Sequence, residues 1–268
     1  FRLSGIELEQ AARDRSKTIM QELSRLTSKY SDNVLDATNA WHRPVTDAAL
    51  LAGLPESARA LARQTAEQRG LDGWVFTLEF PSYYPVMTYA DNRQLREELY
   101  TAYVTRASDH GPHAGQWSNT DLMDQILALR HEAARLLGFN NYAERSLATK
   151  MAESPDQVMG FLNDLAERSR PAAERELEDL TAFASEYNGH TDLQAWDIPY
   201  FSEKLRQQKY AVSQEELKPW FPEPRVVSGL FAIVERLYGL QVETVDGVDT
   251  WHEDVHFYRI RDAAGELR

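Results

Sequence analysis

The chain has 268 residues, 43% of them hydrophobic, a formal net charge of −13 and no cysteine. Six Trp, twelve Tyr and ten Phe residues are enough for a sizeable core in one large domain or two small ones. The negative charge argues against nucleic acid or an anionic membrane as a partner, because both require clustered Lys and Arg. No apolar stretch approaches the roughly 18 residues of a membrane span. The lack of cysteine excludes disulfides and thiol chemistry and suits a reducing, cytoplasmic compartment.

The first quarter of the chain predicts two helices. Apolar residues spaced by three or four form a stripe along the first of them: Ile19, Leu23, Leu26, Tyr30, Val34, Ala37 and Trp41. Pro44 ends this helix, which is expected to be about 35 residues long and to pack against other helices. Pro55 and Gly70 bound a second helix over residues 56–69.

A short strand pair is predicted next, near residues 43–79. Residues 74–78 (WVFTL) have strand composition, and their expected partner is the extended stretch near Val45. Pro81 and Pro85 then bracket an aromatic turn that contains Tyr83 and Tyr84. We interpret this turn as a packed hinge, with a wall of a binding site as the alternative.

The middle of the chain predicts a helix over residues 91–106, a loop over residues 108–117, and a further helix that ends at Gly138. The loop from Asp109 to Gly115 carries Asp109, His110 and His113. We interpret it as a mobile Gly-Pro loop; a metal cluster is the alternative, and contact with a substrate stays open. Ser118 and Asp121 resemble a capping box at the start of the next helix.

Ser154, Pro155 and Gln157 predict another helix start. The expected buried face of that helix consists of Val158, Phe161, Leu162 and Leu165. Pro171 is expected to kink or split the helix, because proline removes one hydrogen bond of the helical ladder. Helices over residues 198–210 and 225–238 follow, separated by a proline-rich turn.

After Gly239 the pattern changes to strand. Residues 242–245 and 252–260 are rich in strand formers, Asp246 and Gly247 mark a turn between them, and a third strand is expected to begin near Leu267. The predicted fold is therefore mainly α, with long packed helices and a small antiparallel β region near the C-terminal end. We expect a helical region over residues 1–240 and a β-hairpin region over residues 241–268.

The string His252-Glu253-Asp254-Val255-His256 matches H-E-x-x-H, which in zinc peptidases supplies two imidazole ligands and a general base. The motif requires a helix, in which residues i and i+4 lie about 5–6 Å apart. On a strand the same residues are about 13 Å apart and cannot share one ion. Because the local sequence predicts strand, we interpret the match as fortuitous. A second near match, His131-Glu132 with Arg135, lies on a predicted helix, but arginine cannot coordinate zinc.

Several stretches are similar to the thimet oligopeptidase family of zinc metallopeptidases. They are residues 30–38 (YSDNVLDAT), 81–89 (PSYYPVMTY), 105–109 (TRASD), 136–143 (LLGFNNYA), 146–152 (SLATKMA), 229–231 (GLF) and 238–239 (YG). The resemblance implies a mainly helical fold with a deep channel, in which zinc activates water for the hydrolysis of short peptides. The zinc-binding H-E-F-G-H helix of the family lies downstream of the matched region.

We therefore expect an internal fragment that lacks the zinc helix and the N-terminal helices of the family. No catalytic, cofactor-binding or metal-binding residue is assigned to this chain, and the chain alone is expected to be inactive. Its expected partners are short peptides, in the complete enzyme, and the missing catalytic segment. Without the missing catalytic segment and the N-terminal helices, we expect the apolar face of the first helix, with Ile19, Leu23, Leu26 and Tyr30, to be bare in this fragment. The alternatives are a non-catalytic helical binding module and a small zinc enzyme that uses His252 and His256.

Overall fold

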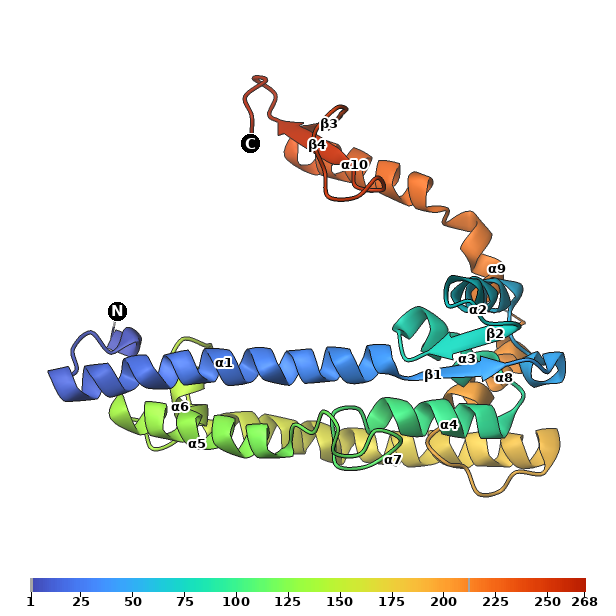
Figure 1. Ribbon diagram of the computed structural model, residues 1–268, viewed down its shortest axis with the longest axis horizontal. Coiled ribbons are helices and arrows are strands. Elements are labelled where there is room, and N and C mark those ends of the chain that lie inside the picture. Colours follow the sequence, from blue (N-terminus) through green and yellow to red (C-terminus); the bar gives the residue numbers. More distant parts are fainter. Residues whose placement is uncertain (1, 212) are drawn as a thin grey trace. The chain divides into compact units, whose positions relative to one another are not determined.

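The computed structural model describes residues 2–211 and 213–268, and the fold is mainly α-helical, as predicted (Figure 1). The chain divides into two compact units, Phe1–Lys209 and Tyr210–Arg268. The helices and strands of the first unit are α1 (Gln10–Ala40), β1 (His42–Val45), α2 (Glu56–Gln68), β2 (Trp74–Thr77), α3 (Phe80–Tyr89), α4 (Arg93–Val104), α5 (Thr120–Leu136), α6 (Tyr142–Leu147), α7 (Pro155–Asn188) and α8 (Ile198–Tyr210). Short 3-10 turns cover Arg2–Ser4 and Ala48–Leu51.

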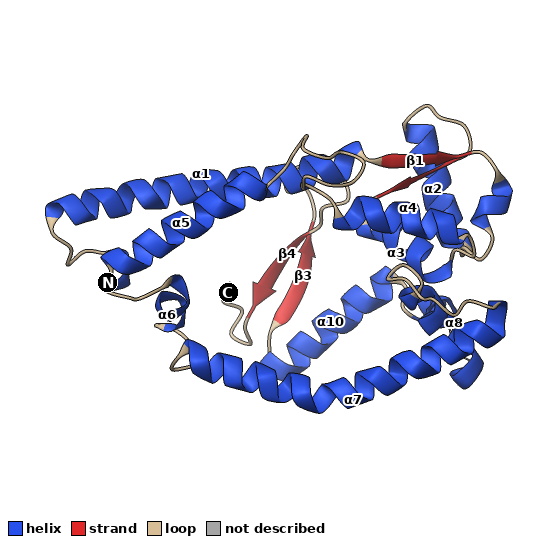
Figure 2. Cartoon of the chain, turned by 90° about the horizontal axis from the view of Figure 1, so that it is seen from below, coloured by secondary structure: helices blue, strands red, loops and turns tan. Residues whose placement is uncertain are grey.

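Helices α1 and α5 lie side by side (Figures 1 and 2). Ile19 and Leu26 on α1 are buried, so the expectation that this apolar face is left bare is wrong for these two residues, while Tyr30 on the same face is 38% exposed. Two polar contacts join the helices as well: Arg15 forms a bidentate ion pair with Glu132 at 2.6 and 2.7 Å, and Asn33 donates to Asn119 at 2.8 Å. Helix α5 therefore packs on this part of the face of α1.

The strand pair forms as predicted. Strand β1 pairs antiparallel with β2, with Val45 opposite Trp74 and His42 opposite Thr77. Around this pair, the side chains of α2, α3 and α4 complete the main core of the first unit. Its buried members include Trp41, Val45, Leu51, Leu54, Ala62, Phe76, Leu78, Val86, Met87, Leu95 and Leu99.

The stretch predicted as an aromatic turn is helix α3. Pro81 lies in the first turn, where a backbone N–H has no helical partner in any case, so proline fits there. Pro85 lies inside the helix, so the helix loses only one hydrogen bond there. Tyr83 stacks on Tyr103 of α4 with ring centroids 4.1 Å apart, and burial raises the pKa of Tyr83 to about 12. Tyr83 packs, as expected of the hinge, but on a helix, whereas Tyr84 is 42% exposed.

Helix termini show which sequence signals form caps. Ser154 accepts from the Gln157 N–H and so caps α7, as predicted. Ser118 does not cap α5: the helix begins one residue later, and the N-cap residue is Asn119. The Asn119 side chain instead binds Asn33 and donates to the Tyr30 carbonyl of α1. Tertiary contact with α1 therefore takes precedence over the local capping box.

Helix α7 differs from its prediction in burial. It is continuous through Pro171, and Figure 2 shows that it bends along its length, as expected of an internal proline. The predicted buried face is exposed, with Phe161 at 64%, Leu162 at 49% and Leu165 at 47%. Only the last third of α7 is covered: Leu180, Phe183 and Ala184 pack with Tyr200 and Phe201 of α8. The sequence correctly predicted where apolar residues stand on this helix. Among the described residues, however, no helix or strand covers its N-terminal part.

The second unit contains α9 (Gln214–Leu217), a 3-10 turn at Lys218–Trp220, α10 (Glu223–Tyr238), β3 (Gln241–Val245) and β4 (Phe257–Arg261). Strands β3 and β4 pair antiparallel, with Val242 opposite Ile260 and Val245 opposite Phe257. The prediction of a strand over residues 252–260 is correct from Phe257 onward and wrong before it. Residues 252–254 form a turn instead, in which the Val255 N–H donates a hydrogen bond to the His252 carbonyl.

Within residues 2–211 and 213–268, no helix has the length and apolar character of a membrane span.

Candidate functional site

The H-E-x-x-H string does not form a helical turn. His252 lies in the turn that precedes β4, where its Nδ1 accepts from the Asp254 N–H at 3.2 Å. His256 lies in the extended approach to β4. Both imidazoles are exposed, and neither lies on a helix that would place them one above the other. The segment does not fit the zinc site that its letters suggest.

The second near match, on α5, takes part in helix packing. His131 is exposed, and the neighbouring Glu132 forms the ion pair with Arg15 of α1. The hydrogen bond from Arg15 lowers the pKa of Glu132. Glu132 is therefore an ionised carboxylate that helps to hold α1 against α5.

The loop from Asp109 to Gly115 does not gather its histidines. His110 lies 3.6 Å from the carboxylate of Asp109, and the ring of His113 contacts that of Trp117 edge-on at 5.4 Å. In the part of the chain that the structure describes, no three His, Asp or Glu side chains are placed to hold a metal ion together. That no catalytic, cofactor or metal residue belongs to this chain stays a prediction.

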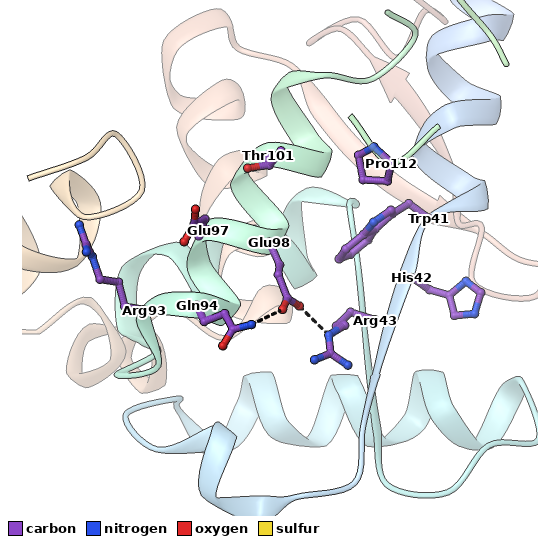
Figure 3. A pocket seen from close by; sticks show the side chains of 9 residues that line it. All are labelled: Trp41, His42, Arg43, Arg93, Gln94, Glu97, Glu98, Thr101 and Pro112. Carbon is purple, nitrogen blue, oxygen red and sulfur yellow. Dashed lines mark hydrogen bonds and ion pairs between the residues drawn. The ribbon is translucent and has the colours of Figure 1, made fainter. Parts of the chain in front are cut away.

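A pocket of about 810 Å³ lies beside α4 in the first unit (Figure 3). Its lining comes from the start of β1, the exposed side of α4 and the loop that follows α4. The lining residues are Trp41, His42, Arg43, Arg93, Gln94, Glu97, Glu98, Thr101 and Pro112. Trp41 is buried and forms an apolar wall, while the other side chains bring carboxylates, guanidinium groups, an amide and an imidazole to the same space.

Contacts within the pocket fix part of its lining. Arg43 donates to Glu98 at 2.7 Å, and Gln94 donates to the other oxygen of Glu98 at 3.2 Å (Figure 3). Glu97 and His42 are exposed on its surface. This mixture of charged and amide groups can hold the polar groups of a ligand. A nucleophile paired with a general base is not evident in it, so the pocket is a candidate for binding and not for bond cleavage.

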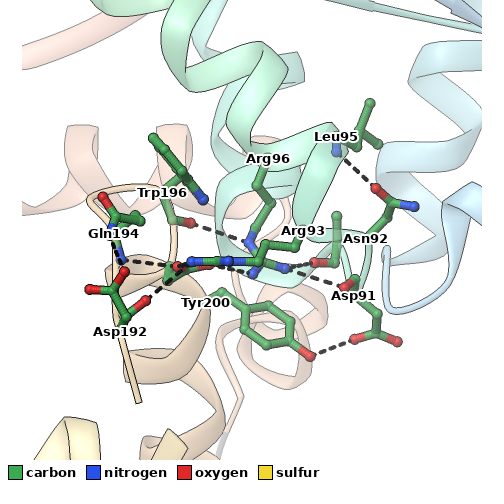
Figure 4. Close-up of polar contacts among 11 residues, drawn as sticks. Asp91, Asn92, Arg93, Leu95, Arg96, Asp192, Gln194, Trp196 and Tyr200 are labelled. Carbon is green, nitrogen blue, oxygen red and sulfur yellow. Dashed lines mark hydrogen bonds and ion pairs between the residues drawn. The ribbon is translucent and has the colours of Figure 1, made fainter. Parts of the chain in front are cut away.

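A buried charge network holds the start of α4 (Figure 4). Arg96 is 1% exposed and donates to Asp197 at 2.8 Å, and Arg93 donates to the same carboxylate at 2.6 Å. Burial alone would raise the pKa of Asp197, but the hydrogen bonds from Arg93, from the Gln194 N–H and from Arg96 lower it. Asp197 is therefore ionised and joins α4 to the start of α8.

Tyr200 extends this network toward the residues that precede α4. Its hydroxyl donates to Asp91 at 2.9 Å, and the guanidinium of Arg96 lies 4.1 Å from the centre of its ring. Burial and the hydrogen bond to Asp91 raise the pKa of Tyr200, so the phenol keeps its proton. The network positions Arg93, Gln94 and Glu97, which line the pocket, relative to the rest of the unit.

Sequence reasoning missed both the pocket and the network. Residues 93 and 197 are more than a hundred positions apart, and no local pattern links them. One signal was present: Arg96 stands beside Leu95 and three positions before Leu99, on the apolar face of α4. A charged residue on such a face is buried only when it is paired.

Sequence comparisons with known proteins show which family this chain is similar to. The sequence profile of peptidase family M3 matches residues 86–268. Oligopeptidase A of Escherichia coli (strain K12) is 55% identical over 268 residues, covering all of this chain. A probable cytosolic oligopeptidase A of Arabidopsis thaliana is 44% identical over 98% of the chain, and a dipeptidyl carboxypeptidase of E. coli is 30% identical over 99%.

The chain spans only 39% of the length of the E. coli oligopeptidase A and 38% of that of the Arabidopsis protein. The matched profile covers more than half of the chain, from α3 to its last residue. The resemblance inferred from residues 81–89 and 136–143 is thereby confirmed: the chain belongs to peptidase family M3.

Proposed function

We propose that this chain is a portion of a zinc-dependent oligopeptidase that hydrolyses short peptides inside a channel. The observation that carries the proposal is the 55% identity to an oligopeptidase A over the whole chain. The chain corresponds to 39% of that relative, so the peptidase activity is assigned to the longer protein.

In this proposal the zinc ligands and the catalytic groups lie outside the 268 residues, and the chain alone is inactive. The turn at His252 supports this assignment, because it separates the two imidazoles of the H-E-x-x-H string from any helix. The helical region, residues 1–240, forms part of the channel wall and limits the size of the substrates. Residues 241–268 form the hairpin region that leads toward the catalytic domain.

We assign contact with the peptide to the pocket beside α4. Its carboxylates, guanidinium groups and Gln94 amide match the groups that a peptide presents along its backbone and at its ends. Glu97 and His42 are exposed there and are therefore accessible to a ligand. Nucleic acid and membranes are not partners in this proposal, given the net charge of −13. We place the protein in the cytoplasm, a compartment that suits a chain without cysteine.

A non-catalytic helical binding module is the second candidate. The exposed apolar residues of α7, such as Phe161 and Leu162, favour it, because large exposed apolar patches mark interaction sites. The two candidates differ in one property: only the first requires the complete protein to cleave peptides.

The test uses the complete gene product and a set of fluorogenic substrates, from short peptides to a folded protein. The proposal predicts cleavage of the short peptides alone, loss of cleavage with a zinc chelator, and its return when zinc is added. Glu97→Ala is expected to raise the KM for short peptides with little change in kcat, whereas Glu67→Ala, on the exposed side of α2, should change neither. A complete protein without chelator-sensitive cleavage would favour the binding module.

A further inference from the structure

Helix α10 carries apolar side chains on two faces. One face lies against the hairpin of its own unit: Phe231 contacts Tyr258 of β4 edge-on at 4.8 Å, and Glu235 accepts from the Val242 N–H of β3 at 2.9 Å. The other face is a stripe of four exposed residues at helical spacing: Val226, Leu230, Ile233 and Leu237. We call these four residues the outer stripe.

The outer stripe has no cover within its unit. Its members are between 49% and 68% exposed, and none of the residues of the second unit whose burial is described (210–211, 213 and 215–268) is buried. A helix with one apolar stripe belongs at a protein surface, whereas a helix with apolar residues on a second face belongs in an interior. The composition of α10 is therefore that of an interior helix, although the unit supplies only one of the layers around it.

The sheet beside α10 also continues beyond its two strands. After β4 the chain turns through Gly265, at φ +81°, and comes back alongside β4. The Asp262 N–H donates to the Glu266 carbonyl at 3.0 Å, the Arg268 N–H donates to the Ile260 carbonyl at 3.0 Å, and Leu267 forms a bridge with Arg261. Leu267 thus pairs with β4 through a single antiparallel bridge, on the edge of β4 that β3 leaves free, and a third strand would continue from this bridge.

We propose that the segment following Arg268 in the longer protein completes this unit: it continues as a third strand along β4 and then covers the outer stripe of α10. The inference rests on the proposed function, which assigns the chain to a longer peptidase. Two observations select this occupant over a second copy of the chain. The match takes up only 39% of the length of the E. coli oligopeptidase A, and the residues that would lead into the segment are already hydrogen-bonded to β4.

Thiol labelling tests the proposal, because the chain has no cysteine of its own. Ile233→Cys places a thiol on the outer stripe, and Ala232→Cys places one on another exposed side of α10, about 100° around the helix axis, as a matched control. Each variant is prepared as the 268-residue chain and as the complete gene product, and the rate of labelling at that position is followed by mass spectrometry. We expect I233C to be labelled about tenfold or more slowly in the complete protein, because labelling then requires local opening, while A232C changes little.

Three results would overturn the proposal. Fast labelling of I233C in both proteins would show that nothing covers the outer stripe. Slow labelling already in the 268-residue chain, at all concentrations, would show that another part of the same chain covers it. Protection that increases with the concentration of the 268-residue chain would identify a second copy as the occupant. Peptide hydrolysis by the complete protein, measured on the same samples, separates failure of this inference from failure of the proposed function.

Hydrogen exchange on the unsubstituted proteins gives an independent readout that does not depend on folding of the variants. The amides of residues 226–237 and 257–261 are expected to exchange about tenfold or more slowly in the complete protein than in the 268-residue chain. Equal exchange in the two proteins would contradict the docking of a segment on this unit.

Discussion

At the scale of single residues, Asp197 joins parts of the first unit that lie a hundred positions apart. Its carboxylate accepts from both Arg93 and Arg96, and neither Asp197 nor Arg96 is exposed by more than 1%. Removing one partner of a buried ion pair leaves the other charge without compensation, which costs about 3–5 kcal/mol. An exposed pair such as Arg63 with Glu67 contributes much less, because solvent screens it.

Asp197→Asn is therefore expected to lower the free energy of unfolding of the 268-residue chain by about 3 kcal/mol. The matched control is Glu67→Gln, expected to change it by less than about 0.5 kcal/mol. Urea unfolding followed by tryptophan fluorescence measures both variants. Equal effects of the two substitutions would mean that the network does not stabilise α4.

The same network predicts a dependence on pH. The pKa of Asp197 is lowered from its ordinary value of 3.8, so its contribution to stability is fully present above that value and is lost as the pH falls through the folded-state pKa. The stability difference between the wild type and Asp197→Asn should be constant from about pH 7 to pH 5 and should decrease below about pH 4. Urea unfolding at a series of pH values tests this, and a difference that already vanishes near pH 5 would contradict the assignment.

Local sequence signals predicted residue-scale features only where the contacts are local. Ser154 caps α7 as expected, since its partner Gln157 is three residues away. The Ser118 cap failed, because Asn119 binds Asn33 of α1, which lies 86 positions earlier in the sequence. Arg96 was missed for the same reason, as its partner lies beyond the range of any helical pattern.

At the scale of elements, α7 shows the limit of a periodic pattern. The sequence predicted a buried face in the N-terminal part of the helix, at Phe161, Leu162 and Leu165 among others, and the structure buries side chains only in its C-terminal part. Leu180 is 7% exposed, whereas Leu162 is 49% exposed. Periodicity predicts which side of a helix will be apolar, but only the presence of a partner decides whether that side is buried.

The two leucines give a paired prediction on a single helix. Leu180→Ala should lower the free energy of unfolding of the 268-residue chain by about 2–5 kcal/mol, through lost packing and the cavity left behind. Leu162→Ala should change it by less than about 0.5 kcal/mol, as for other exposed positions. Thermal and urea unfolding measure both. A large effect of Leu162→Ala would show that the N-terminal part of α7 is packed in solution.

Proline signals were ambiguous at this scale. The sequence placed a turn at residues 81–85, and α3 is a helix there because Pro81 occupies its first turn and Pro85 removes a single hydrogen bond.

The strand pairs were predicted correctly, because β-branched and aromatic runs were flanked by turn residues. The start of β4 was set five residues too early, since the turn at residues 252–254 has no glycine or proline to mark it.

The turn at His252 leads to a prediction about metal binding. We expect the 268-residue chain to bind no zinc through His252 and His256, because the two imidazoles do not lie on one helix. Isothermal titration with zinc should give the same weak response for the wild type and for the double variant His252→Ala, His256→Ala. Binding of one zinc per wild-type chain that the double variant loses would restore the interpretation as a small zinc enzyme.

At the scale of the whole molecule, the two units differ in whether they contain a buried core of their own. The first has a core around the β1–β2 pair, which the sequence indicated through its aromatic and β-branched runs. None of the residues of the second unit whose burial is described is buried, and this unit carries the outer stripe of α10. The sequence could not show this difference, because exposure depends on neighbours, and the proposed neighbours belong to the longer protein.

The central claim is that the peptidase activity belongs to the longer protein and that its catalytic centre lies outside these 268 residues. The most direct test compares the initial rates at which the purified 268-residue chain and the complete gene product cleave the same short fluorogenic peptide, each with and without added zinc. The account predicts zinc-dependent cleavage by the complete protein and none by the 268-residue chain. Zinc-dependent cleavage by the 268-residue chain, or its absence from the complete protein, would contradict the account.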